Sequence, residues 1–268
     1  MRVIGSIALS VFRESVRDRV LYNLVLFAVL LIGASYLLGQ LTAGQEMKII
    51  KDLGLSATSI FGLFIAVFIG IGLVWKEVER RSVYSLLAKP ITRAEFILGK
   101  YAGLLLTLLV NLAIMSVALY GVLGAMALLS PPAVVAALDA PPLDPRMLLA
   151  IGLIFVNLAL VTALALFFST FSSPILSAVF TLGLYVVGQF NADLKHFEQV
   201  VDSRVAVWVA RTLYYVLPNL APFDIKALVV HGQPVSAGYV LITAAYGVVY
   251  IAFVLSAAIF IFTRRDFK

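Results

Sequence analysis

Long apolar runs alternate with short polar segments along the whole chain of 268 residues. A helix needs about 20 apolar residues to cross a bilayer, and six runs have this length. The predicted spans are Leu21–Leu41, Leu55–Trp75, Tyr101–Leu129, Met147–Phe168, Pro174–Phe190 and Tyr239–Phe262. The pattern therefore predicts an all-α polytopic membrane protein with a single transmembrane domain over residues 1–268.

Five segments outside these spans have predicted structures of their own. In residues 1–19, apolar positions recur on one helical face while four arginines lie elsewhere, which predicts an interfacial helix at the lipid headgroups. A signal peptide is the alternative, but the next apolar run lacks a clear cleavage site. Residues 42–54 are predicted to be a short polar loop, and Phe171–Ser173 a tight turn.

The long segment 191–238 mixes aromatic, aliphatic and basic residues. Its part Arg204–Leu217 is too short and too charged to cross comfortably. We expect a re-entrant or interfacial helix pair there, ended by Pro218 and Pro222. The alternative is a seventh crossing, which would move the C-terminal arginines to the other side of the membrane.

Residues 76–100 form the longest strongly charged stretch and cannot lie in lipid. Pro90 predicts a break, and Thr92 with Glu95 predicts a capping box that starts a new helix. The residues before the break predict a short amphipathic helix whose polar face is a docking surface. The alternative is an ordinary loop whose arginines only fix the topology.

Composition supports the membrane class, because 62% of the residues are hydrophobic and only 13% are charged. The net charge of +6 fits membrane orientation better than nucleic-acid binding. Thirteen Lys and Arg lie on the side of the termini and the 76–100 hairpin, against seven on the other side. The positive-inside rule therefore predicts that both termini and this hairpin are cytoplasmic.

Catalytic motifs are missing from the sequence. The Gly99-Lys100 pair is followed by Tyr101 and belongs to no Walker loop. There are no cysteines, and the two histidines are interpreted as surface residues, so we expect no metal site, no cofactor and no enzymatic activity in this chain. Two polar residues within the spans, Asn111 and Asn157, are candidates for a translocation path; alternatively, they hydrogen-bond neighbouring helices.

Several motifs carry a resemblance to a known family. In the hairpin these are Glu79, Leu86, Leu87, Pro90, Ile91, Arg93, Gly99 and Lys100. The segments FRESVRDRVLY and LPNLAPFDI, the latter being Leu217–Ile225, match as well. Together they resemble ABC-2-type ABC transporter permeases over essentially the whole chain, with a closer likeness to the branch of multi-copper enzyme maturation permeases. Arg80, Arg81 and Ser82 depart from the Gly-Gly-Thr of many relatives.

The resemblance implies the transmembrane subunit of an ABC transporter, driven by a separate ATPase that binds ATP and magnesium. It also implies a second permease subunit and a coupling helix in the hairpin. The implied ATPase-coupling residues are Glu77, Glu79, Arg80, Arg81, Tyr84 and Arg93. A different class of function stays open: a membrane subunit that passes force from an ATPase to an extracytoplasmic protein without moving a substrate. A membrane-embedded enzyme is disfavoured by the missing catalytic clusters.

Overall fold

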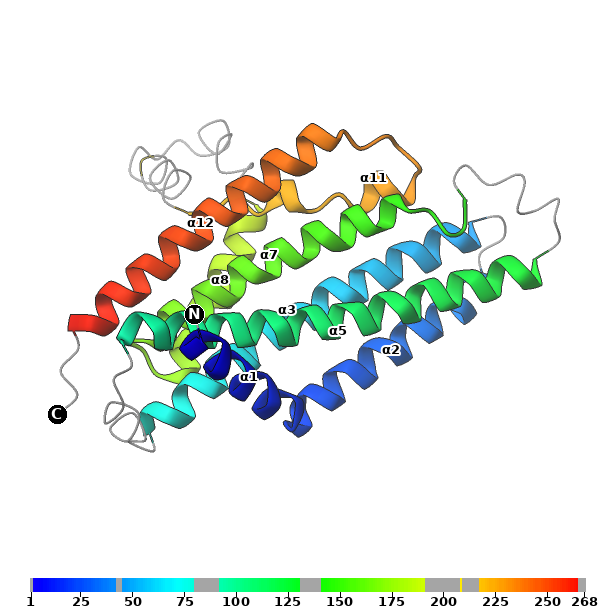
Figure 1. Cartoon of the computed structure of the whole chain (residues 1–268). Helices are drawn as coiled ribbons and strands as arrows, with labels where there is room; N and C mark the ends of the chain where they lie inside the picture. Colours follow the sequence, from blue (N-terminus) through cyan, green and yellow to red (C-terminus); the bar gives the residue numbers. More distant parts are fainter. Residues whose placement is uncertain are drawn as a thin grey trace.

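The protein is a bundle of long α-helices (Figure 1). The computed structural model describes residues 2–41, 45–79, 92–130, 141–190, 208 and 217–264, with only the backbone described at residues 2 and 73–79. Up to residue 190, the described helices are α1 (Arg2–Val16), α2 (Arg19–Gln40), α3 (Glu46–Glu79), α5 (Arg93–Leu129), α7 (Arg146–Ser169) and α8 (Pro174–Gln189). They are followed by the 3₁₀ turn η2 (Ala221–Phe223), the short helix α11 (Lys226–Val230) and the long helix α12 (Ala237–Arg264).

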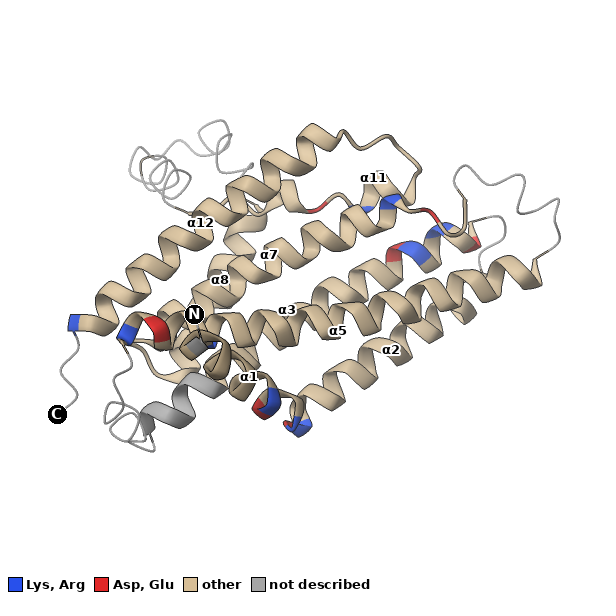
Figure 2. Cartoon of the chain, viewed as in Figure 1, with Lys and Arg blue, Asp and Glu red and all other residues tan. Residues whose placement is uncertain are grey.

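The bundle has two ends with different elements. One end, here the near end, holds α1, the last turns of α3, the first turns of α5 and the last turns of α12 (Figure 1). The opposite far end holds the start of α3 and α7 and the end of α5. Charged residues gather at the two ends and leave the middle of the long helices without charge (Figure 2). This distribution is typical of a protein that crosses a bilayer, because charge is costly in hydrocarbon.

Five of the described helices are long and apolar enough to cross a membrane: α2, α3, α5, α7 and α12. The prediction of an all-helical membrane protein is therefore confirmed. The inner helices α3 and α7 are largely buried, whereas only 22% and 28% of the apolar windows of α2 and α12 are buried. An apolar exterior of this kind suits contact with lipid, because lipid tails are as apolar as the side chains that face them.

The second long helix begins earlier than expected. Residues 42–54 were predicted to be a polar loop, but α3 already begins at Glu46. Met47 and Ile50 lie one turn apart and are both buried, so an apolar stripe continues through the polar sequence. The prediction was wrong because it weighed the average polarity of the segment and not the helical spacing of its apolar residues.

Lys51 explains how a charged residue fits on the buried face of α3. The side chain is 2% exposed, and its Nζ donates a hydrogen bond of 2.8 Å to the carbonyl oxygen of Pro141. Asp144 is also buried and interacts electrostatically with Lys51. The hydroxyl of Tyr120 donates to the carbonyl oxygen of Asp144 at 2.9 Å. These bonds join α3, α5 and the segment before α7 into what we call the far-end clasp, made of Lys51, Tyr120, Pro141 and Asp144.

We expect Lys51→Met to destabilise the protein. The substitution leaves the carbonyl of Pro141 without this donor and Asp144 without the nearest positive charge, at a cost of about 1–3 kcal/mol. Thermal denaturation of the detergent-purified protein measures the change as a lower melting temperature. Lys48→Met is the control, because it removes the same charge one turn earlier on α3, where the side chain of Lys48 is only half buried. Equal melting temperatures for the two variants would contradict the clasp.

The predicted span Pro174–Phe190 is shorter than a full crossing. Helix α8 has 16 residues, about 24 Å at 1.5 Å per residue, whereas the hydrocarbon core is about 30 Å thick. Residues 217–232 continue its course to the far end. The amide of Leu220 donates to the carbonyl of Gly188 near the end of α8 at 2.9 Å, and Arg146 at the start of α7 donates to the carbonyl of Gly232 at 2.9 Å. Between Phe190 and Leu217, the chain lies outside the described residues apart from Trp208.

Two local predictions are confirmed, and two others cannot be compared. The tight turn at Phe171–Ser173 is present between α7 and α8. The N-terminal helix extends over Arg2–Val16, inside the predicted range. The predicted break at Pro90 and the predicted helix pair over Arg204–Leu217 lie outside the described residues, except for Trp208 and Leu217.

Candidate functional site

Helix α5 begins at the near end with the predicted capping box. The side-chain oxygen Oγ1 of Thr92 accepts a hydrogen bond of 3.2 Å from the amide of Glu95. In return, the amide of Thr92 donates to Oε2 of Glu95 at 2.9 Å. Two of the free donors at the helix start are satisfied in this way. The box fixes where the hairpin ends and α5 begins.

Arg93 connects the start of α5 to the end of α12. Its Nη1 donates hydrogen bonds of 2.8 Å to the carbonyl oxygens of Phe262 and Thr263. These carbonyls lie in the last turn of α12, where backbone acceptors lack helical partners and carry partial negative charge. The ring of Phe262 also stacks on Phe96 with 5.8 Å between centroids. The first turn of α5 is therefore fixed to the last turn of α12.

The buried residue Lys100 lies one turn after Phe96. It is 1% exposed, and its Nζ lies 4.8 Å from the centroid of the Phe96 ring. A cation over an aromatic face is attracted by the ring quadrupole. Lys100 therefore strengthens the same contact between α5 and α12 from inside the bundle.

The helix α1 is docked on α5 through two glycines one turn apart. A Cβ on Gly99 would lie 2.7 Å from Cβ of Ile7, and a Cβ on Gly103 would lie 2.6 Å from the carbonyl oxygen of Ala8. Distances this short leave no room for any side chain at either position. The Gly99-x-x-x-Gly103 spacing thus serves to bring α1 close to α5 within one chain. We call Arg93, Phe96, Gly99, Lys100 and Gly103, with their partners on α1 and α12, the near-end junction.

The structure describes only part of the predicted coupling residues. Glu77 and Glu79 lie in the last turn of α3, but their side chains are outside the described part. The positions of Arg80, Arg81 and Tyr84 lie outside the described residues altogether. Arg93 is described, and the bonds given above connect it to α12.

The two candidate translocation residues have different surroundings. Asn111 is buried, and its Nδ2 donates to the carbonyl oxygen of Thr107 on the same helix, at 2.6 Å. Asn157 lies halfway along α7 and lines a cavity of about 310 Å³. Within the described part of the chain, only Asn157 of this pair lines that cavity.

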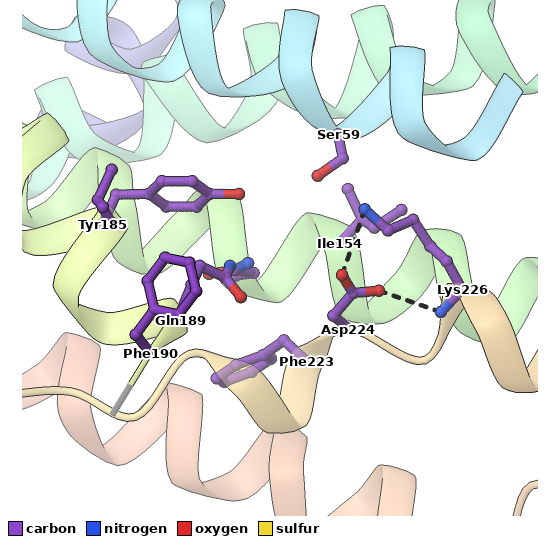
Figure 3. Close-up of a pocket in the computed structure, with 10 residues that line it drawn as sticks. Ser59, Ile154, Tyr185, Gln189, Phe190, Phe223, Asp224 and Lys226 are labelled. Atoms are coloured by element: carbon purple, nitrogen blue, oxygen red, sulfur yellow. Dashed lines mark hydrogen bonds and ion pairs between the residues drawn. The ribbon is translucent and has the colours of Figure 1, made fainter. Parts of the chain in front are cut away.

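The cavity lies where α8 ends and η2 begins (Figure 3). Side chains from α3, α7, α8 and the segment after η2 point into one space, with Tyr185 and Gln189 on one side and Asp224 and Lys226 on the other. The carboxylate of Asp224 and Nζ of Lys226 are 3.3 Å apart. The lining residues are Ser59, Ile154, Asn157, Tyr185, Val186, Gln189, Phe190, Phe223, Asp224 and Lys226.

Sequence reasoning missed this charged pair, because Lys226 was counted only as a loop residue in the orientation argument. The signal that pointed to it was the segment LPNLAPFDI, which was noted only as part of the resemblance. In the structure this segment is packed inside the bundle: Leu220 and Phe223 are buried, and the hydroxyl of Tyr246 on α12 accepts from the amide of Asn219 at 2.9 Å. Its conformation places Asp224 at the cavity.

The comparison with known families agrees with this architecture. Residues 6–267 match the family model described as ABC-2 family transporter protein. The chain belongs to this family. As an ABC-2 transporter protein it is a multi-pass membrane protein and a membrane component of a transport system. No individual curated protein matches the chain, so the assignment rests on the family match over nearly its whole length.

Proposed function

We propose that this ABC-2 transporter protein is the permease subunit of an ABC exporter. In this proposal a separate ATPase subunit binds ATP and magnesium and docks on the 76–100 hairpin, and the chain itself pairs with a second permease subunit, either identical to it or different. The near end then faces the cytoplasm of a bacterial inner membrane, with both termini on that side. The chain itself supplies no catalytic residue.

The observation that carries the proposal is the near-end junction beside the hairpin. Movement of the hairpin reaches α5 directly at the capping box. From there it reaches α12 through Arg93 and Phe96, and α1 through Gly99 and Gly103. A rigid connection of three helices at one end is what a coupling element needs, because packed interfaces transmit displacement rather than absorb it.

The docking site is tested by reversing charge in the hairpin. We expect Arg80→Glu/Arg81→Glu to abolish co-purification of the partner ATPase subunit, while the permease still inserts and stays monodisperse. Lys48→Glu at the far end is the control, and it should leave co-purification unchanged. Undiminished co-purification of the ATPase with the double variant would overturn the assignment of the hairpin as the docking site.

A second function is supported by the length of α5. This helix runs unbroken over 37 residues from the near-end junction to the far-end clasp. It therefore suits a subunit that transmits force from an ATPase to an extracytoplasmic partner without moving a substrate. Vesicles that carry the purified complex separate the two functions. An exporter accumulates or releases a cargo with ATP and not with a non-hydrolysable analogue, whereas a force transmitter changes only the labelling of far-end residues.

A further inference from the structure

The cavity of Figure 3 lies at a break in the membrane-spanning backbone. Helix α8 stops at Gln189, and the segment that continues its course is non-helical from Leu217 to Leu220. Irregular backbone is tolerated at membrane depth where it is buried in protein or lines a cavity. The ends of interrupted helices are also where transport proteins bind small polar ligands, because free backbone groups and charged side chains meet there.

One buried polar group in the cavity lacks a partner. Asn157 is 6% exposed, and its Oδ1 accepts no hydrogen bond from any residue that the structure describes. A buried amide oxygen without a donor is unfavourable, so it requires a donor from water or from a ligand. A volume of about 310 Å³ is some ten times the volume of one water molecule. The cavity therefore has room for a small molecule or a lipid headgroup.

The charges of the cavity restrict the chemistry of that ligand. Asp224 and Lys226 form an ion pair at 3.3 Å, and the amide of Lys226 also donates to Oδ1 of Asp224 at 3.2 Å. The pair is neutral as a whole. The side chains of Lys226 and Asp224 are 19% and 43% exposed, so a bound ligand loses only part of its hydration, and a net charge against the apolar walls still carries a cost. A zwitterion avoids this cost, because its cation can bind Asp224 while its anion binds Lys226.

The other walls suit the same ligand. The aromatic rings of Tyr185, Phe190 and Phe223 line the cavity, and a ring face attracts an ammonium group. Val186 and Phe190 are 52% and 59% exposed on the outer side of α8, so the cavity is bordered by apolar side chains that face outward from the described bundle. Such a border gives access to a headgroup whose acyl chains stay in the bilayer.

We propose that this cavity binds a phosphoethanolamine-type zwitterion, with its ammonium on Asp224 and its phosphate on Lys226. The amide of Asn157 then hydrogen-bonds the bound group. The shared chemistry occurs both in a zwitterionic phospholipid headgroup and in the free compound. The idea that this ligand is transported cargo rests on the proposed function, whereas its binding does not.

Isothermal titration of the detergent-purified chain, without any ATPase, tests the binding. The probes are dihexanoyl phosphatidylethanolamine, dihexanoyl phosphatidylglycerol and glycerophosphoethanolamine, a soluble phosphodiester with the same neutral headgroup. We expect the ethanolamine lipid to bind at least tenfold more tightly than the glycerol lipid, which has no ammonium. Binding of the free glycerophosphoethanolamine with similar affinity assigns a soluble ligand, and binding of the lipid alone assigns a membrane ligand. Equal affinity for the two lipids, or no binding of any probe, overturns the proposal.

Variants connect the binding to the cavity. Asp224→Asn leaves Lys226 as the only charge, so we expect the preference to invert towards phosphatidylglycerol. A merely structural role of Asp224 would weaken both lipids alike and would overturn the assignment. Asp52→Asn is the control, because it removes an exposed carboxylate outside the cavity and should change neither affinity.

Asn157→Leu provides a second test that does not disturb the ion pair. It removes a buried polar group without a described partner, so we expect the protein to remain folded and as stable as the parent. Its affinity for phosphatidylethanolamine should fall at least tenfold, because leucine removes the amide that hydrogen-bonds the bound group. Unchanged affinity in this variant would place the ligand elsewhere and overturn the proposal.

Discussion

Replacing Gly103 with alanine should release α1 from the bundle. The new Cβ would lie 2.6 Å from the carbonyl oxygen of Ala8 and 2.7 Å from Cβ of Val11. The first of these neighbours is backbone and cannot move aside without shifting α1 as a whole. Overpacking of this kind costs about 1–3 kcal/mol, which corresponds to an increase of about fivefold to a hundredfold in the undocked population.

The absence of native cysteines makes this release measurable with a single thiol. Ser15 lies on α1 and is completely buried, so Ser15→Cys should react slowly with a water-soluble maleimide in the parent protein. Adding Gly103→Ala should increase the labelling rate about fivefold or more, because labelling follows the open population. Gly121→Ala is the matched control, since it makes the same change on α5 where no atom lies within 4 Å of the new Cβ. Similar rates in all three proteins would show that the glycine pair does not hold α1.

Arg93→Gln should free the last turn of α12. Glutamine removes the positive charge and the guanidinium that binds the carbonyls of Phe262 and Thr263. Hydrogen bonds that involve a charged group contribute about 1.5–3 kcal/mol. The loss should therefore raise the opening of this turn about tenfold to a hundredfold.

Hydrogen exchange of peptides from the end of α12 measures this opening directly. Arg264→Gln is the control, because Arg264 is in the same turn and carries the same charge, but lies over the ring of Phe260 at 4.2 Å. We expect fast exchange in Arg93→Gln and near-parent exchange in Arg264→Gln. If the two variants exchange alike, Arg93 acts only through its positive charge at the end of α12. The hydrogen bonds between α5 and α12 then do not stabilise this turn.

Features that depend on neighbours in the sequence were predicted well. The Thr92 and Glu95 pair predicts the start of α5, because both partners of the capping box lie within four residues. Five of the six predicted spans follow from length and hydropathy alone, because apolar runs of about 20 residues are typical of helices that cross the hydrocarbon core of a bilayer. The turn at Phe171–Ser173 is likewise a local break between two apolar runs.

Features that depend on distant partners were not predictable. Arg93 was assigned to an ATPase contact by resemblance, and nothing in the hairpin indicates that two carbonyls about 170 residues later accept its bonds. The glycine spacing at 99 and 103 predicts close packing but does not name α1 as the partner. Asn111 and Asn157 are the same residue type in similar apolar helices, and only the packed structure gives one a backbone acceptor and the other a cavity.

The unbroken course of α5 has a consequence for how far small rotations carry. At 1.5 Å per residue its 37 residues make a rod of about 55 Å. If the near-end junction is the pivot, a tilt of about 5° displaces the opposite tip by about 5 Å, roughly one helical turn. Rotation on this scale is enough to move Tyr120 away from the Asp144 carbonyl. The hydrogen bond between them at the far end therefore depends on the tilt of α5, which is set at the near end on the other side of the membrane.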